Sequence, residues 1–384
     1  MDPHFESAAS AVERITAGYN LGNSLDATGK YDGPDITKYE LQWGEPFVTK
    51  TFIEALKKAG FDAVRVPVTW KGHFDKDGNI DKAWLGRVGE IVDHVLDLGL
   101  YCIINVHHDG GEGSWIKSSP QDFEKNGSVF RYLWQQIAAY FKDYGERLLF
   151  EALNEPINEA RQWLANDENS VMGTSLYNQA FVDAVRASGS NNSMRNLVVM
   201  PYAGSGTEGR LDTFKLPSDP AKDHIILEVH NYDPQGFCWY KAIGQQLRDT
   251  WGTTGDLAQI DHFKSLMKAF MDKNNVPAIV GEYGSQDKHN ESERAKHAYA
   301  FTSAMREIGV KCFWWDCGAF CIMDRKQETV RFPEIVRAVT TVLIQTVNGR
   351  NQCCLRYCAP PFFCFACVIH SIVNTAPKIT VNFV

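Results

Sequence analysis

Residues 148–156 read LLFEALNEP, and this stretch contains the pattern that decides the fold. An apolar run that carries one glutamate ends abruptly at Asn154, Glu155 and Pro156. Apolar runs without strict alternation of polar residues are typical of strands in a parallel sheet that is covered on both faces. Pro156 has no N–H to extend a ladder and disfavours helical geometry in the residue before it. We therefore predict a strand that ends with Glu155 held in an extended conformation.

The same combination of an apolar run and an amphipathic stretch recurs along the chain. Further strand candidates lie at 17–22, 61–68, 100–108, 195–203, 224–234, 276–284 and 310–318. Helical periodicity separates most of them, at 49–60, 81–99, 128–145, 175–189, 260–275 and 291–309, and a last helix is predicted at 332–347. In the first of these helices Thr49 or Thr51 is the candidate N-cap, and Gly60 ends the helix.

Eight strands that alternate with helices fit either an open doubly wound sheet or a closed barrel. The chain has no G-x-G-x-x-G after the first strand and no P-loop, so the nucleotide-binding sheet loses support. We predict an α/β fold, a (β/α)8 TIM barrel that forms a single catalytic domain with elaborated βα loops. The barrel is expected over residues 12–347, after an N-terminal extension at 1–11 and before a cysteine-rich tail at 348–384 that lies outside the barrel.

The overall composition excludes several classes of partner. The 384 residues carry a net charge of −8 and form no long basic cluster, which gives no electrostatic basis for binding nucleic acid or an anionic membrane. No apolar run approaches the length of a membrane span, and the mean hydropathy is −0.29. The first fifteen residues lack a basic segment followed by an apolar one, so no signal peptide is predicted in this chain.

Ten cysteines are present, and half of them lie between residues 353 and 367. Only Cys364 and Cys367 fit a C-x-x-C unit, so a zinc knuckle is disfavoured and no metal is predicted there. Cys102 and Cys312 lie in strand-like runs, where a thiol behaves as a small buried apolar group.

Polar residues gather where the predicted strands end. In a TIM barrel the C-terminal ends of the strands form the active-site mouth, and polar groups there are costly unless they are paired or hydrated. A barrel does not need them at that place for stability. The strand ends carry Asn23, Arg65, His107, His108, Asn154, Glu155, His230, Tyr232, Glu282 and Trp315.

Two carboxylates, Glu155 and Glu282, follow strands that lie well apart around the ring, so they can face each other across the mouth. Glycoside hydrolysis requires such a pair, one acid to protonate the leaving oxygen and one carboxylate to attack the anomeric carbon or activate water. We expect Arg65 to keep Glu282 ionised. Asn154 could bond a sugar hydroxyl, and Trp315 offers a flat apolar face to a sugar ring.

Other readings of single residues stay open beside this one. Glu45 also precedes a proline but follows no strand, so we interpret it as a structural or rim residue. His107 and His108 suggest a metal site, yet adjacent strand residues diverge and no further ligand has fixed spacing, which favours hydrogen-bonding roles. Four further histidines lie on predicted helices or loops and are expected at the surface: His94, His262, His289 and His297.

The chain resembles glycoside hydrolase family 5, and within it the subfamily 4 endoglucanases and xyloglucanases. The resemblance runs from about residue 18 to 347 and is carried, in order and spacing, by GYNLGNSLDA, WGEP, AGFDAVRVPVTW, IINVHHD, ALNEP, EVHNYDP, VGEYG, FWWDCG and MDR. It implies a retaining endo-β-1,4-glucanase (a cellulase) without metal or organic cofactor, with a β-glucan polysaccharide as substrate. A secreted monomer is implied as well.

The resemblance also implies a role for each matching residue. Glu155 would be the acid/base and Glu282 the nucleophile, held by Arg65 and Tyr232. Asn154 would contact the 2-hydroxyl of the sugar. The supporting and sugar-binding residues would be His107, His108 and His230 around the central subsite, Trp315 as its platform, Asn23 and Asp26 on the non-reducing side, and Trp43, Trp115 and Trp239 in the outer cleft.

Two departures from the family pattern bear on the rim of the site. WGEP has Glu45 where asparagine is expected, and DCGAFC places Cys317 and Cys321 near Trp315, where a disulfide is conceivable. The motifs do not decide between cellulose and xyloglucan, mixed-linkage glucan, xylan or mannan. A catalytically silent sugar-binding barrel and a metal-dependent hydrolase remain as rivals from other classes.

Overall fold

The computed structural model describes residues 5–110, 114–241 and 246–341, together with the backbone of 344–345 and 351–352. The chain divides into two units, Met1–Thr340 and Thr341–Val384, where the sequence predicted boundaries after residues 11 and 347. In the second unit β11 (Ile344–Gln345) pairs antiparallel with β12 (Asn351–Gln352). The cysteines of the predicted tail lie outside the described residues.

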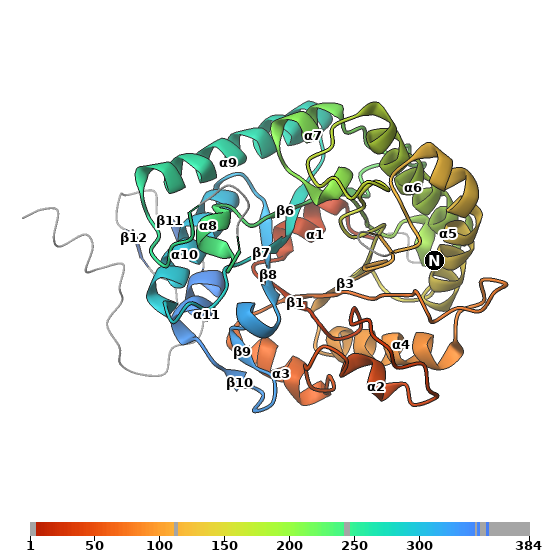
Figure 1. The fold of residues 1–384 in the computed structure, drawn as a ribbon, viewed down its shortest axis with the longest axis horizontal. Helices are drawn as coiled ribbons and strands as arrows, with labels where there is room; N and C mark the ends of the chain where they lie inside the picture. The colour runs from red at the N-terminus through yellow and green to blue at the C-terminus, as the bar shows by residue number, and fades with distance from the viewer. Residues whose placement is uncertain (1–4, 111–113, 242–245, 342–343, 346–350, 353–384) are drawn as a thin grey trace, which may run out of the picture. The chain divides into compact units, whose positions relative to one another are not determined.

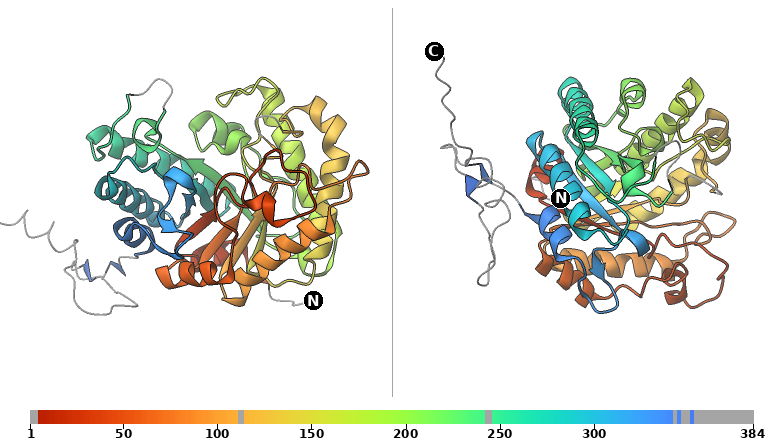
Figure 2. Two further views of the ribbon diagram at one scale, coloured as in Figure 1. Left: turned by 60° about the horizontal axis from the view of Figure 1, so that its bottom comes forward. Right: turned by 60° about the vertical axis from the view of Figure 1, so that its left-hand side comes forward.

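The first unit is the predicted (β/α)8 barrel. Its parallel strands close into a ring in sequence order, and β1 pairs with both β2 and β8. The strands are β1 (Gly18–Leu21), β2 (Ala63–Val66), β3 (Tyr101–Asn105), β4 (Leu148–Glu151), β5 (Leu197–Val199), β6 (Ile225–Asn231), β7 (Ala278–Tyr283) and β8 (Lys311–Asp316). Figures 1 and 2 show helices around this ring.

The longer helices lie where the sequence predicted helical periodicity, and three short ones at 37–40, 208–213 and 235–238 were not predicted. In chain order the helices after β1 are α2 (Thr37–Glu40), α3 (Lys50–Ala59), α4 (Lys82–Asp97), α5 (Pro120–Tyr140), α6 (Glu168–Ala187), α7 (Glu208–Thr213), α8 (Gln235–Cys238), α9 (Thr254–Asn274), α10 (Glu291–Glu307) and α11 (Pro333–Thr340). Thr49 caps α3 by accepting a hydrogen bond from the amide of Phe52, and Gly60 ends it in the left-handed conformation with φ of 103°. The described part of the last helix ends at Thr340, short of the predicted residue 347.

One predicted surface histidine is buried. His297 lies on the inner face of α10 with its ring 5.5 Å from that of Phe237, and burial lowers its pKa to about 4. The prediction was wrong because α10 turns the stripe of Arg294, His297, Ala298 and Phe301 toward the barrel, where helical spacing places all four on one face. His262 and His289 are exposed, and His94 is half-buried.

The interior of the barrel is layered. Its floor is apolar and is closed by α1 (Ala8–Arg14), whose residues join strand residues in one buried cluster: Ala8, Ala11, Val12, Ile15, Ala63, Tyr101, Ile103, Leu149, Val198, Ile226, Ile279 and Phe313. Two residues further along the strands, the inward positions become polar. Because side chains on a strand repeat every second residue, the floor and the polar layer belong to one face of the sheet.

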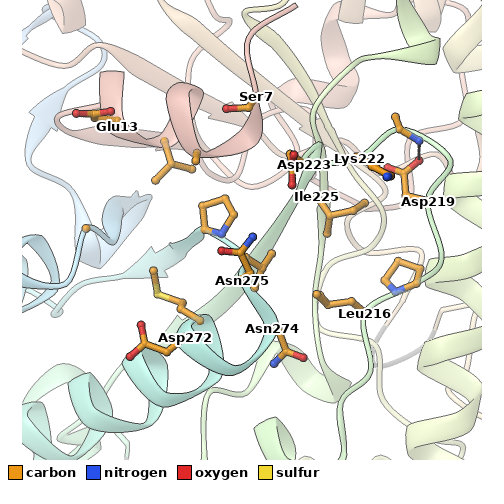
Figure 3. A pocket seen from close by; sticks show the side chains of 18 residues that line it. Ser7, Glu13, Leu216, Asp219, Lys222, Asp223, Ile225, Asp272, Asn274 and Asn275 are labelled. Carbon is orange, nitrogen blue, oxygen red and sulfur yellow. Dashed lines mark hydrogen bonds between the residues drawn. The ribbon is translucent and has the colours of Figure 1, made fainter.

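A cavity of about 900 Å3 lies at the N-terminal end of the barrel (Figure 3). Its lining includes Ser7 and Glu13 beside α1, Ile225 at the start of β6 and Asn274 at the end of α9. None of the predicted site residues lines it, and catalytic groups of TIM barrels lie at the opposite, C-terminal end of the strands.

Among the described helices, none combines the length and apolar character that crossing a bilayer requires.

Candidate active site

Glu155 does not end an extended strand. β4 stops at Glu151, and Glu155 follows four residues later with φ of 42°, in the left-handed region. The amide of Asn154 donates to the carbonyl of Val106, and that of Ala203 donates to the carbonyl of Pro156, so both sides of the turn are anchored. The prediction of extended geometry was wrong because Pro156 disfavours only the right-handed helical region before it, and left-handed geometry remains accessible at a strained functional turn.

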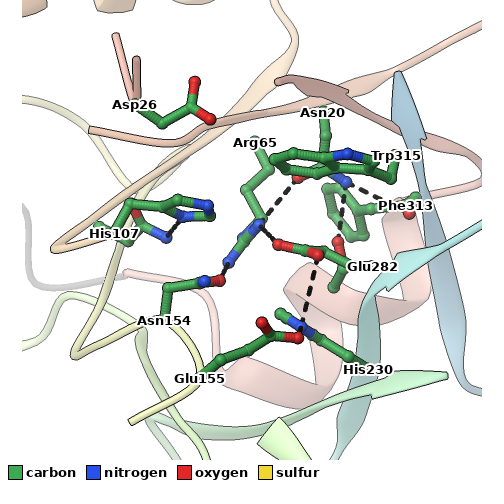
Figure 4. Close-up of polar contacts among 12 residues, drawn as sticks. Asn20, Asp26, Arg65, His107, Asn154, Glu155, His230, Glu282, Phe313 and Trp315 are labelled. Atoms are coloured by element: carbon green, nitrogen blue, oxygen red, sulfur yellow. Dashed lines mark hydrogen bonds and ion pairs between the residues drawn. The ribbon is translucent and has the colours of Figure 1, made fainter. Parts of the chain in front are cut away.

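His230 lies beside both of the predicted catalytic carboxylates (Figure 4). Its Nδ1 is 2.8 Å from Oε1 of Glu155 and 3.5 Å from Oε2 of Glu282. One oxygen of each carboxylate and a ring nitrogen of His230 all lie within 4.8 Å of one another. Retaining glycosidases have carboxyl groups about 5–5.5 Å apart and inverting ones about 6.5–9.5 Å, so this spacing fits retention.

Glu282 is buried at the end of β7 and is held from two sides. Arg65 donates to Oε1 at 2.8 Å, and the hydroxyl of Tyr232 donates to Oε2 at 2.9 Å. Burial raises the pKa of Glu282 above its ordinary value, and the charges of His230 and Arg65 oppose this rise. The expected contact of Arg65 and Tyr232 with this carboxylate is therefore present in the structure.

Arg65 is the centre of a buried polar layer that the sequence reading did not identify. Its Nε and Nη2 donate to the two oxygens of Glu151 at 2.6 and 2.7 Å, and Nη2 also donates to Asn154 at 2.8 Å. Nη1 donates to Asn20 at 2.9 Å and to Glu282. These bonds engage all five N–H groups of the guanidinium in a site without solvent exposure.

Four residues of this layer were missed by the sequence analysis: Asn20, Asn105, Glu151 and Glu228. Asn105 donates to Glu151 at 2.8 Å and contacts Nδ1 of His107 at 3.0 Å, so the layer connects to the mouth. The signal for Glu151 was visible as the one glutamate inside LLFEALNEP, two positions after the floor residue Leu149. Period two places both side chains on the inner face.

His230 is held by carboxylates on both ring nitrogens. Nδ1 faces Glu155 and Glu282, and Nε2 lies 3.3 Å from Oε1 of Glu228. Burial would lower the pKa of His230, but the Glu282 charge and the contacts with Glu155 and Glu228 raise it to about 10. The ring is therefore an imidazolium at neutral pH.

His107 and His108 lie beside the loop that follows β1. Burial and neighbouring positive charges hold the pKa of His107 well below its usual range, so this ring is neutral. Both oxygens of Asp26 accept hydrogen bonds from backbone amides, those of Asn23 at 3.0 Å and Ser24 at 2.7 Å. The carboxylate of Asp26 is buried and shapes the loop, while Asn23 is only half-buried and is better placed to meet a sugar.

Asp26, His107 and His108 also place one ligand-type atom each within 4.8 Å of one another. Such a set could hold a cation, but each of its atoms already has a partner in the protein. Burial opposes protonation of His108, but Asp26, whose Oδ2 lies 3.6 Å from Nε2 of this ring, raises its pKa. Asp26 also accepts from backbone amides, and His107 contacts Asn105. The arrangement therefore favours hydrogen-bonding roles for these residues over a metal site.

The predicted sugar-binding tryptophans occupy different depths. Trp315 is 9% exposed and stacks parallel to His107, with ring centroids 5.7 Å apart. Trp43 is 40% exposed and lies 5.1 Å from the ring of His108. The ring of Trp239 lies 5.0 Å from that of Tyr232, which holds Glu282.

Trp115 is fixed further out, because its Nε1 donates to Asp109 at 2.6 Å and its ring meets Phe74.

The rim residues that depart from the family pattern have defined contacts. Glu45 accepts a hydrogen bond from the amide of Gly318 at 2.8 Å and lies 3.8 Å from Arg325, so it ties its loop to the segment after β8. Cys317 and Cys321 are free thiols, and no disulfide joins them. Nε1 of Trp315 donates to the sulfur of Cys317 at 3.0 Å, which helps to orient the indole.

The family model described as Cellulase (glycosyl hydrolase family 5) matches residues 25–320. The chain belongs to glycoside hydrolase family 5. It is 36% identical to endoglucanase A of Clostridium longisporum over 81% of this chain and 59% of that protein, and 35% identical to endoglucanase A of Ruminococcus albus over 82% and 85%. The chain spans only 40% of the cellulase/esterase CelE of Acetivibrio thermocellus, at 36% identity, so it covers about half of the curated relatives that align first.

Solved structures of family 5 enzymes superpose over nearly the whole barrel. A broad-specificity endoglucanase from Ruminococcus champanellensis with bound cellotriose gives a TM-score of 0.83 at 30% identity, covering 88% of this chain and 100% of that one. A Prevotella bryantii enzyme in complex with a xyloglucan tetradecasaccharide gives 0.81 at 34% identity, covering 88% and 98%. The barrel and its eight-strand order are thus those of the family.

Proposed function

We propose that this protein is a retaining endo-β-1,4-glucanase that cuts internal bonds of a β-glucan chain. The observation that carries the proposal is the position of Glu155 and Glu282, with oxygens within 4.8 Å of each other at the barrel mouth. The endoglucanases among its relatives support the same activity.

The first half of the reaction would transfer the glycosyl group to the protein. Protonated Glu155 gives its proton to the glycosidic oxygen, Oε of Glu282 attacks the anomeric carbon, and the bond between that carbon and the leaving oxygen breaks. Arg65 and Tyr232 fix the attacking carboxylate from opposite sides, which limits the reorientation it needs. The side-chain oxygen of Asn154 accepts a hydrogen bond from Arg65, so its NH2 group can face a sugar hydroxyl.

The second half would release the sugar with its original anomeric configuration. Glu155, now a carboxylate, removes a proton from water, the hydroxide oxygen attacks the anomeric carbon, and the ester bond to Glu282 breaks. The imidazolium of His230 stands beside whichever carboxylate is charged, at Glu282 before the first step and at Glu155 after it. Trp315 would stack against the sugar ring that contains the anomeric carbon in both halves of the reaction.

A broader substrate range is the second candidate. The aligned relatives include a broad-specificity endoglucanase and an enzyme in complex with xyloglucan. Trp43 is 40% exposed and could contact a decorated chain. We infer that xyloglucan and mixed-linkage glucan are substrates beside unbranched β-1,4-glucan.

The test is a panel of carboxymethylcellulose, xyloglucan, lichenan, xylan and mannan, followed by reducing-sugar release and by viscosity. An endo-acting glucanase lowers viscosity early, and proton NMR of the first product shows the β-anomer. Glu155→Gln and Glu282→Gln are expected to lose at least about 10³-fold in kcat, which is about 4 kcal/mol of transition-state stabilisation.

Glu45→Gln is the matched control, because Glu45 also precedes a proline at the rim but should retain activity. Activity on mannan alone, or full activity of Glu282→Gln, would exclude this function. Activity that disappears in EDTA and returns with a divalent cation would instead support the metal-dependent alternative.

We also propose that the protein acts outside the cell and as a monomer, since polymeric glucan does not cross a membrane and each barrel holds a complete pair of carboxylates. Light scattering of the purified chain measures the oligomeric state. Activity in culture medium against that in washed cells of the source organism measures the location.

A further inference from the structure

Glu228 is a buried carboxylate that the reaction described above does not use. It lies on β6 between the floor residue Ile226 and His230, with its side chain fully buried in the barrel. Oε1 lies 3.3 Å from Nε2 of His230 and 3.3 Å from Nε of Arg65. Oε2 is buried and has no hydrogen-bond partner. Leaving a buried carboxylate oxygen unpaired costs stability, so a barrel selected for stability alone would not place it there.

The neighbouring strand makes room for this carboxylate. The register between β6 and β7 shifts at Val229 and His230, so that His230 pairs with Glu282 and Gly281 is passed over. A Cβ atom at Gly281 would lie 1.5 Å from Oε1 of Glu228. The irregularity therefore serves two purposes at once, because it places Glu282 beside His230 and leaves space for Glu228 behind the ring.

The two ring nitrogens of His230 decide its protonation state by geometry. A neutral imidazole has one donor and one acceptor nitrogen, and a carboxylate can only accept. When Glu155 is ionised, His230 meets it at Nδ1 and Glu228 at Nε2, so both nitrogens must donate for both contacts to be satisfied. When Glu155 carries its proton before the first step, the ionised Glu282 lies 3.5 Å from the same Nδ1, and Glu228 still needs a donor at Nε2. Without Glu228, a neutral ring could serve the carboxylates on the Nδ1 side alone.

We propose that Glu228 is a positioning residue for hydrolysis, which keeps His230 as an imidazolium and holds its Nδ1 between the acid/base and the nucleophile. This inference rests on the proposed function, since it gives the imidazolium a task in that reaction. Negative charge moves from Glu282 to Glu155 when the covalent bond to the sugar forms. A fixed positive charge 2.8 and 3.5 Å from the two oxygens stabilises both states without rearrangement.

Charged and titratable groups face this cluster from several elements. They are Arg65 from β2, Glu151 from β4, Glu155 from the loop after β4, Glu282 from β7, Tyr232 from the loop after β6, and the neutral His107 from the end of β3. Arg65 is bound mainly to Glu151 and Glu282. The carboxylate of Glu228 is the group that contacts Nε2 of His230 directly.

Glu228→Gln tests the proposal, because glutamine keeps the shape and can still accept at Nε2 but carries no charge. Loss of the negative charge lowers the pKa of His230, so the ring loses its proton at a lower pH. An opposite charge at this distance shifts a pKa by about 1–3 units. We expect the pKa of the His230 imidazolium to fall by about one unit or more, with kcat lowered at a pH above that new pKa and KM on cellohexaose changed less than about threefold.

Glu40→Gln is the matched control. Glu40 is equally buried and is paired with Arg87 on α4, away from the described site. Its loss should lower the melting temperature and leave the pH profile in place. A further control combines Glu228→Gln with His230→Asn. In this background Glu228→Gln should have little further effect on kcat, because Glu228 acts through the imidazole ring.

NMR titration of the His230 imidazole, assigned from the His230→Asn spectrum, gives a reading that does not need activity. A His230 pKa unchanged between the wild-type protein and Glu228→Gln would overturn the proposal even if every substrate test failed. A kcat of Glu228→Gln that equals the wild-type value at a pH above the lowered pKa of His230, while Glu282→Gln is inactive, would overturn it and leave the proposed function standing. If Glu228→Gln does not fold, Glu228→Asp takes its place, because the shorter side chain moves the negative charge away from Nε2. The pKa of His230 must then fall, but by less than is expected for Glu228→Gln.

Discussion

Replacing Arg65 by methionine should destabilise the barrel strongly, because the polar layer depends on this one guanidinium. Arg65 is fully buried and forms ion pairs with Glu151, Glu228 and Glu282 at 2.6, 3.3 and 2.8 Å. Methionine has a similar length and no charge, so it leaves these carboxylates with His230 as their nearest cation. Removing one partner of a buried ion pair costs about 3–5 kcal/mol. We expect a loss of at least about 3 kcal/mol in the free energy of unfolding at pH 8.

The pH dependence of this loss follows from the carboxylates. Burial raises the pKa of Glu151 to about 7 even though Arg65 opposes the rise, so removal of Arg65 raises it further. A protonated carboxyl group needs no cation. The destabilisation in Arg65→Met should therefore shrink as the pH falls from 8 to 5. In the double variant Arg65→Met/Glu151→Gln, about 1–3 kcal/mol of stability should return, because residues of one buried network are not additive.

Urea unfolding followed by circular dichroism, with reversibility checked by refolding, measures these free energies. The four proteins of the cycle are the wild type, the two single variants and the double variant, each at pH 5 and pH 8. A loss below about 1 kcal/mol for Arg65→Met at pH 8 would refute the reasoning, and so would a loss that grows as the pH falls.

Three further outcomes are expected. Trp315→Ala should lower kcat/KM on soluble glucan by about tenfold or more, which corresponds to about 1.4 kcal/mol of lost sugar stacking, and it should also lower the melting temperature because the indole is only 9% exposed. Gly281→Ala should lose about 1–3 kcal/mol of unfolding free energy in urea, because the new Cβ would lie 1.5 Å from Oε1 of Glu228, and a change within 0.3 kcal/mol would contradict the packing argument. The pKa of His230 is raised to about 10, so its contribution to stability is complete below the unfolded value near 6.5 and is lost as the pH rises toward 10. Between pH 7 and 8.5 the titration of His230 should therefore lower the unfolding free energy by at most about 1.4 kcal/mol per pH unit. His230→Gln should lack this contribution to the slope.

The barrel was predictable because its strands are short apolar runs and its helices carry one clear apolar stripe. Thr49 and Gly60 marked the ends of α3 correctly, since capping is a local property of the sequence. The turn at Glu155 was not predictable in the same way. Its left-handed geometry depends on backbone contacts with Val106 and Ala203, which come from other parts of the chain.

The position of the site residues followed from the rule that strand ends meet at one mouth. The rule does not say which residues support them from below, and so the polar layer was missed. Glu151 and Glu228 lie inside apolar runs that were predicted as strands, and the prediction gave these two residues no role. Side chains two residues apart on a strand point to the same face of the sheet. Because Glu151 and Glu228 follow the inward-facing Leu149 and Ile226 by two residues, this spacing would have indicated that both charges face inward. The error at His297 was the opposite one, a buried residue predicted at the surface. It was placed there because it is polar, although its neighbours at helical spacing, Ala298 and Phe301, lie on the buried face of α10.

The charges of the polar layer do not balance, and this imbalance favours the uptake of a proton by one of its carboxyl groups. Arg65 and His230 carry two positive charges against the three negative charges of Glu151, Glu228 and Glu282. A buried excess of negative charge is relieved when one carboxyl group binds a proton, and the pKa of Glu151 is raised to about 7 by burial, with Glu228 adding to the rise. Burial raises the pKa of Glu282 as well, and the charges of His230 and Arg65 oppose that rise. Proton uptake at Glu151, which accepts from Arg65 and Asn105, relieves the excess charge without neutralising the attacking carboxylate, which is the arrangement that a nucleophile in a buried site requires.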